Sequence, residues 1–143
     1  MANSVQNAPE GVMKTEDDVR DLEKLIVQLQ GLHTEISILA KKAPNDGLNL
    51  FKLKLVNNIL AKGNSILTGH YKPLENFATF DESALPTNSD VTMVLALYNE
   101  QAERFRSNSM VHHDHNYKWY YLVKGAASQI EGSPPTKIGT EKK

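Results

Sequence analysis

The feature that most constrains this fold is a run of aliphatic residues spaced alternately three and four apart near the start of the chain. The run consists of Leu22, Leu25, Leu29, Leu32, Ile36 and Leu39. This spacing places all of them on one side of an α-helix, at the a and d positions of a heptad repeat. Such a seam is stable only when other helices cover it, so the sequence predicts an all-α helical bundle.

Three long helices are predicted from apolar periodicity and end signals. Lys41 and Lys42 suit the negative end of the first helix, and Pro44 ends it. The turn Pro44-Asn45-Asp46-Gly47 follows, with Asp46 expected to cap the second helix. So short a turn implies an antiparallel hairpin. The predicted helices cover about residues 15–43, 48–67 and 88–108.

Residues 117–124 contain a cluster of aromatic side chains, with Tyr117, Trp119, Tyr120 and Tyr121 close together. We interpret this segment as a short aromatic C-terminal helix, because an isolated strand is unstable and the sequence shows no evident partner strand. A strand is the open alternative, since aromatic and β-branched residues favour strands.

The domain organisation is predicted from where large apolar residues occur. Residues 14–124 are expected to form a single helical domain. Residues 1–13 and 125–143 are rich in small, polar, Gly and Pro residues. Such segments bury too little apolar surface to offset the entropy of ordering, so both are expected to be disordered.

Composition excludes several classes of protein. The 143 residues include no cysteine, which rules out a disulfide framework and a thiolate zinc site. Basic and acidic side chains number 16 and 17, so the chain lacks the excess of positive charge typical of a dedicated nucleic-acid binder. The longest apolar run, Val91–Tyr98, is too short to cross a bilayer. We therefore expect a cytoplasmic protein without a membrane segment, and no motif indicates a cofactor or an enzyme.

The function that the sequence favours is that of a small non-enzymatic binding protein. Ile26 and Ile38 lie beside the heptad seam and widen its apolar face, so a monomer of three helices would leave part of that face uncovered. Packing within the chain is the ordinary explanation of the seam, and pairing of part of it with a second copy or a partner helix is the functional hypothesis, with a homodimer expected. The candidate partner-binding residues are Ile26, Leu29, Ile36, Ile38, Tyr117 and Tyr121.

A second hypothesis is a nucleic-acid or nucleotide binder. The predicted second helix carries Lys52, Lys54, Asn58 and Lys62, three of which recur every four residues and so share one face. Tyr117 and Tyr121 would supply rings on which bases can stack. A lysine face that is simply solvated explains the same pattern. The nucleic-acid or nucleotide binder therefore ranks second, behind the binding protein.

The only cluster of ligand-type side chains that we identify is His112, His113, Asp114 and His115. Imidazole and carboxylate groups suit zinc and other first-row metals. The dipeptide His113-Asp114 also resembles the metal-binding pair of metal-dependent phosphohydrolases, which makes such an enzyme a distant third hypothesis. Because adjacent residues converge poorly on one ion and no further ligands can be assigned, we predict a solvated loop and no metal site.

Overall fold

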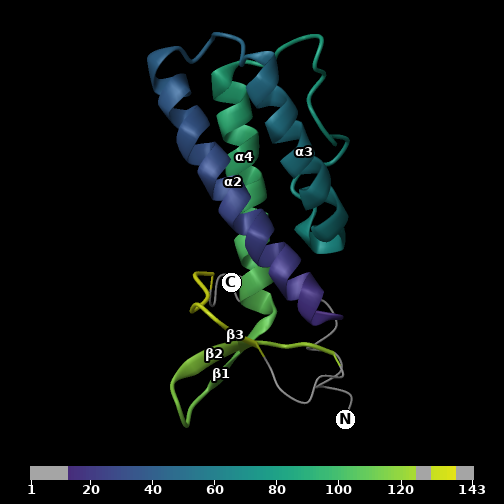
Figure 1. Cartoon of the computed structure of the whole chain (residues 1–143), viewed down its shortest axis with the longest axis vertical. Coiled ribbons are helices and arrows are strands. Elements are labelled where there is room, and N and C mark those ends of the chain that lie inside the picture. The colour runs from purple at the N-terminus through teal and green to yellow at the C-terminus, as the bar shows by residue number, and fades with distance from the viewer. Residues whose placement is uncertain (1–12, 125–129, 138–143) are drawn as a thin grey trace. The chain divides into compact units, whose positions relative to one another are not determined.

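The computed structural model describes residues 13–124 and 130–137. The chain divides into two compact units, of which one is Lys24–Ala102 and the other combines the segments before and after it. The elements in order are α2 (Glu16–Lys42), α3 (Leu50–Ile66), the 3-10 helix η1 (Gly69–Tyr71), α4 (Asn88–Asn108), β1 (Met110–His113), β2 (Lys118–Tyr121) and β3 (Ile130–Gly132) (Figure 1). The described chain is thus mostly helical, with a small antiparallel sheet.

Helix α2 begins at a reciprocal cap. The backbone N–H of Asp18 donates to the Thr15 hydroxyl at 3.1 Å, and the Asp18 carboxylate accepts from the backbone N–H of Thr15 at 3.1 Å. Asp therefore performs the role that Glu or Gln has in the usual capping box. Lys41 and Lys42 occupy the last turn, where positive charge stabilises the helix dipole.

The unit Lys24–Ala102 is built from α2, α3 and α4 packed side by side (Figure 1). Gly63 on α3 allows close packing against Tyr98 of α4 and Leu25 of α2. A Cβ at this position would lie 3.1 Å from the ring of Tyr98 and 3.8 Å from Leu25. The core of this unit includes Leu25, Leu29, Ile36, Leu48, Leu53, Val56, Leu60, Leu67, Tyr71, Val91, Val94, Leu95, Tyr98 and Ala102.

The caps of α3 and α4 come from residues next to each helix. The Asn49 side chain accepts from the N–H of Lys52 at 2.9 Å and caps α3, so the expectation that Asp46 would do so is wrong. The hydroxyl of Thr87 accepts from the N–H of Asp90 at the start of α4. A side-chain cap requires the side chain to reach the first turn, and Asp46 lies too far before Leu50 for that.

The connection between α3 and α4 is held by two asparagines of α3. The Asn57 amide donates to the carbonyl of Phe80 and accepts from its N–H, both at 2.9 Å. Asn64 donates to the carbonyl of Ala78 at 2.8 Å and accepts from the Tyr98 hydroxyl at 2.6 Å. These bonds satisfy backbone groups that a loop would otherwise leave unpaired near the core.

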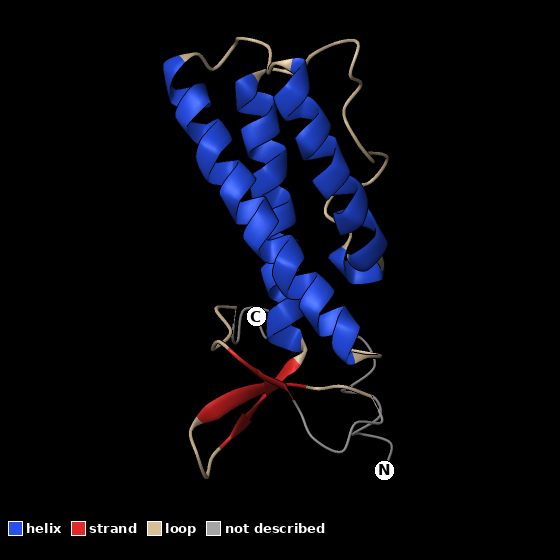
Figure 2. Cartoon of the chain, in the orientation of Figure 1, coloured by secondary structure: helices blue, strands red, loops and turns tan. Residues whose placement is uncertain are grey.

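The short aromatic C-terminal helix that the sequence predicts is wrong. Figure 2 shows strands there, and β1, β2 and β3 form an antiparallel sheet in that order. Met110 lies opposite Tyr121, and His113 opposite Lys118. The partner strand is the segment Met110–His113. It was not predicted because two of its four residues are histidines, which the sequence predicts to lie in a solvated loop. Tyr117 closes the hairpin turn with φ of 58°, a left-handed conformation.

The prediction that residues 125–143 lack structure does not hold for residues 130–137. Strand β3 pairs with β2, with Gly132 opposite Trp119 and Ile130 opposite Tyr121. Gly132 is required there, because a Cβ would lie 2.6 Å from the Tyr121 ring. At the other end, Met13 pairs with Val123 through a parallel bridge. The remaining parts of the predicted tails, residues 1–12, 125–129 and 138–143, lie outside the described residues.

Candidate interaction surfaces

Helix α2 carries apolar side chains on the side that faces away from the core. Val27 and Ile38 are 66% and 48% exposed. Gly31 and Thr34 lie between them and are exposed too, and a Cβ on Gly31 would meet no atom within 4 Å. Spacings of four, three and four keep these residues in line on the helix surface. We call Val27, Gly31, Thr34 and Ile38 the outer stripe of α2.

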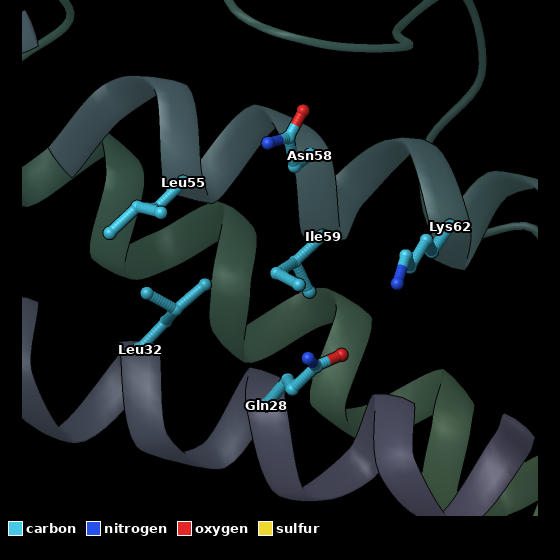
Figure 3. Close-up of a pocket in the computed structure, with 6 residues that line it drawn as sticks. All are labelled: Gln28, Leu32, Leu55, Asn58, Ile59 and Lys62. Carbon is cyan, nitrogen blue, oxygen red and sulfur yellow. The ribbon is translucent and has the colours of Figure 1, made fainter. Parts of the chain in front are cut away.

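A groove of about 500 Å³ runs between α2 and α3 within the unit Lys24–Ala102. Figure 3 shows aliphatic side chains from both helices along its walls and polar groups toward one end. Leu32, a member of the heptad seam, is only half-buried because it lines this groove and is not fully covered by α3. The lining residues of this α2–α3 groove are Gln28, Leu32, Leu55, Asn58, Ile59 and Lys62.

The candidate partner-binding residues are distributed between core and surface. Leu29 and Ile36 are buried in the core of the chain, at 0% and 1% exposure, so a partner cannot reach them. Ile26 is half-buried and Ile38 is exposed. The two tyrosines are separated in the same way, since Tyr117 is 82% exposed and Tyr121 is fully buried. Of these candidates, Ile38 and Tyr117 are the exposed side chains.

The lysine face of α3 is partly occupied by acidic and loop contacts. Lys54 pairs with Glu82 at 3.4 Å, and Lys52 is half-buried. Asn58 and Lys62 belong to the α2–α3 groove rather than to a separate basic patch. A buried Tyr121 cannot stack on a base. Of the two candidate stacking rings, Tyr117 is therefore the accessible one.

The histidine cluster lies in the hairpin between β1 and β2. His113 stacks on Tyr120 at 4.3 Å and on His115 at 5.6 Å, measured between ring centroids. His112 contacts Asp114, with Nδ1 and Oδ1 2.9 Å apart. Successive strand residues point to opposite faces, so His112 and His113 diverge. Among the residues that the structure describes, no three histidine or acidic side chains are grouped so that they could hold a metal ion.

A buried guanidinium holds the C-terminal segment against the end of α4. Arg106 donates to both Glu103 oxygens at 2.8 and 2.9 Å, and to the carbonyls of Ser133 and Pro134 at 2.8 Å each. The Glu103 carboxylate also accepts from the backbone N–H of Thr136 at 2.9 Å. Burial works to raise the pKa of Glu103, but the hydrogen bonds from Arg106 and Thr136 outweigh it, and the pKa lies below its ordinary value.

Tyr121 is the buried polar side chain of the sheet. Its hydroxyl donates to the Glu23 carboxylate at 3.0 Å. Burial raises the pKa of Tyr121 to about 12, because the phenolate would lose its hydration inside the protein. The residue therefore acts as a neutral core side chain with one satisfied polar end.

Of the residues on the two surfaces, Ile38, Asn58 and Lys62 are candidates from the sequence. The residues that the sequence-based selection missed are Val27, Gln28, Gly31, Leu32, Thr34, Leu55 and Ile59. A signal for Val27 exists, since Val27 lies eleven residues before Ile38 and hence in line with it on a helix. Gln28 carries no such signal. Its position becomes significant only when α3 is placed beside α2.

Comparison with family models, with curated proteins and with solved structures finds no match for this chain. Within the described residues, no helix combines the length and apolar character needed to span a membrane.

Proposed function

We propose that this chain is a small non-enzymatic binding protein that self-associates through the outer stripe of α2. The observation that carries the proposal is the exposure of Val27 and Ile38 on a helix whose opposite side is buried in the core. Large aliphatic side chains lined up in this way on a rigid element are typical of protein interfaces.

The symmetry of the stripe favours a second copy as the partner. A two-fold interface must be self-complementary, so that residue i meets residue j and j meets i. The spacing of four, three and four reads the same in both directions along α2. An antiparallel copy therefore brings Val27 opposite Ile38 at each end and Gly31 opposite Thr34 in the middle.

The sizes of the side chains suit this pairing. Gly31 and Thr34 are small and lie at the centre, where two helices must approach most closely. Val27 and Ile38 are about 16 Å apart along the helix axis, which is the length of a short helix-to-helix contact. Antiparallel packing also aligns the helix dipoles favourably.

The non-enzymatic part of the proposal is supported by where the shifted pKa values occur. Asp81 has a lowered pKa because the Ser83 side chain and backbone donate to it within a loop, and burial raises the pKa of Tyr98 between the helices. The shifted pKa values of Glu103 and Tyr121 arise from contacts that hold the C-terminal segment and the sheet. Catalytic groups usually combine a shifted pKa with a cleft. None of these four residues lines the α2–α3 groove.

Sedimentation equilibrium of the wild type and of a Val27→Glu/Ile38→Glu variant tests self-association. We expect the wild type to sediment as a dimer at tens of micromolar and the variant as a monomer with unchanged circular dichroism. Met93→Glu is the matched control, because Met93 is 59% exposed on α4 and lies outside the stripe. A monomeric wild type, or a Met93→Glu variant that dissociates equally, contradicts the proposal.

A further inference from the structure

The α2–α3 groove has a polar end and an apolar body. Figure 3 shows the side chains of Gln28 and Lys62 near one end of the groove, while Leu32, Leu55 and Ile59 lie along it. Gln28 and Leu32 come from α2 and lie one turn apart, as do Ile59 and Lys62 on α3. A molecule lying along the groove would meet an ammonium group at one end and aliphatic side chains beyond it.

The polar end contains groups without partners. The Oε1 atom of Gln28 is buried and accepts no hydrogen bond. Among the described residues, no carboxylate lies within ion-pair distance of Lys62, in contrast to Lys54, which pairs with Glu82. A buried amide oxygen without a donor costs about 1–3 kcal/mol. An anion that draws Lys62 over the groove would let its ammonium donate to Gln28 as well, since this group has three N–H donors.

We propose that the α2–α3 groove binds a free aliphatic carboxylate, with the carboxylate on the Lys62 ammonium, which also donates to Gln28, and the alkyl chain along Leu32, Leu55 and Ile59. A groove of about 500 Å³ has the size of a small-molecule site, and apolar walls with a few polar groups at one end are typical of such sites. This inference rests on different residues from the outer stripe of α2 and does not depend on self-association.

The head group and the chain length follow from the same geometry. A single ammonium group suits a singly charged carboxylate, whereas phosphate groups are usually held by arginine forks or several backbone N–H groups. Lys62 and Leu55 are seven residues apart on α3, which is about 10 Å along the axis. An alkyl chain of medium length, such as that of octanoate, covers this distance.

Titration of the full-length protein with sodium octanoate, followed through the methyl signals of isotope-labelled Leu and Ile, tests the site. We expect saturable shifts at Leu32, Leu55 and Ile59. Octanol, which has the same chain without the charge, should bind more weakly. Acetate, which has the charge without the chain, should cause no saturable shift. Absence of saturable shifts at the groove methyl groups with octanoate overturns the proposal.

Two lysine variants separate the groove from general surface charge. Lys62→Met keeps the length of the side chain and removes the charge, and should weaken octanoate binding about five- to tenfold while leaving octanol binding unchanged. Lys54→Met is the control, because Lys54 pairs with Glu82 and does not line the groove, and should bind octanoate like the wild type. Equal weakening by both variants, or none by Lys62→Met, would show that Lys62 does not hold the carboxylate.

The apolar half of the groove is tested independently with Leu55→Asn. Leu55 is 43% exposed, so this change leaves the core intact. We expect it to weaken octanoate and octanol alike, because both use the same alkyl contacts. If Leu55→Asn binds both like the wild type, the alkyl chain does not lie along this wall and the proposal is wrong. A Val27→Glu/Ile38→Glu variant should bind octanoate normally, which distinguishes failure of this site from failure of self-association.

Discussion

Arg106 forms a bidentate salt bridge with Glu103 at the end of α4, with Nε 2.8 Å from Oε1 and Nη2 2.9 Å from Oε2. The guanidinium is buried and also donates to the carbonyls of Ser133 and Pro134. One side chain thereby satisfies the carboxylate of Glu103 on the same helix and two backbone carbonyls that lie 27 and 28 residues later in the sequence. This contact therefore ties the residues directly after β3 to the end of α4.

Arg106→Met should lower the free energy of unfolding by about 3 kcal/mol, because it leaves a partly buried carboxylate without its counterion. Urea unfolding measures the loss, and faster amide exchange in β3 should accompany it. Arg20→Met is the control. Arg20 pairs with Asp17 at 3.0 Å but is 67% exposed, so its loss should cost less than about 0.5 kcal/mol. Equal losses in the two variants would show that burial does not strengthen the Arg106 contact.

Alkaline pH should destabilise the protein through Tyr121. Its pKa is about 12 in the folded protein and about 10 in an unfolded chain. The stabilisation is complete below pH 10 and is lost as the pH rises toward 12, by about 2 kcal/mol. Urea unfolding at a series of pH values should show this loss in the wild type and a smaller one in Tyr121→Phe. Parallel curves for the two proteins would mean that Tyr121 ionises as an exposed tyrosine does.

Asn57→Ala should destabilise the fold and release the connection around Phe80, because the backbone N–H and C=O of Phe80 both lose their partner. We expect a loss of about 2 kcal/mol. The neighbouring Asn58 is exposed, and Asn58→Ala should change stability by less than about 0.5 kcal/mol. Thermal unfolding of the two variants gives a direct comparison, and a similar loss in both would contradict the assigned role of Asn57.

Two glycines of the helices should respond oppositely to alanine. Gly63→Ala should cost about 1–3 kcal/mol, since its Cβ would lie 3.1 Å from the Tyr98 ring, which is buried and held by Asn64. Gly31→Ala meets no atom within 4 Å and should stabilise α2 by about 0.5–1 kcal/mol. Both are best measured by urea unfolding in an Ile38→Glu background, so that self-association does not contribute. A stabilising Gly63→Ala would show that α3 and α4 can separate easily.

The three long helices could be predicted because their signals are local. Apolar spacing, the dipole-compatible charges of α2 and the break at Pro44 all act within a few residues of the element that they define. The predicted third helix, 88–108, agrees with α4, and the first two differ from α2 and α3 by two residues or fewer at each end.

The sheet could not be predicted because each strand pairs with a segment that is distant in the sequence or whose composition is not typical of a strand. The residues KWYY of β2 have no helical or strand preference strong enough to decide alone, and Tyr121 becomes buried only when Met110 pairs with it on one side and Ile130 on the other. Strand β3 lies in a segment whose sequence indicates disorder, and its partners are distant in the sequence: β2 pairs with it, and Arg106 binds the two residues that follow it.

The candidate surfaces divide in the same way. Sequence alone determined that α2 has one strongly apolar side and that Ile38 lies beyond it, because helical periodicity fixes which residues share a face. Only the tertiary structure decided that Leu29 and Ile36 are covered, that Leu32 remains half-buried, and that Gln28 and Lys62 line the same groove. Burial is a property of what a neighbouring helix covers, and the spacing of residues within one helix carries no information about where that neighbour stops.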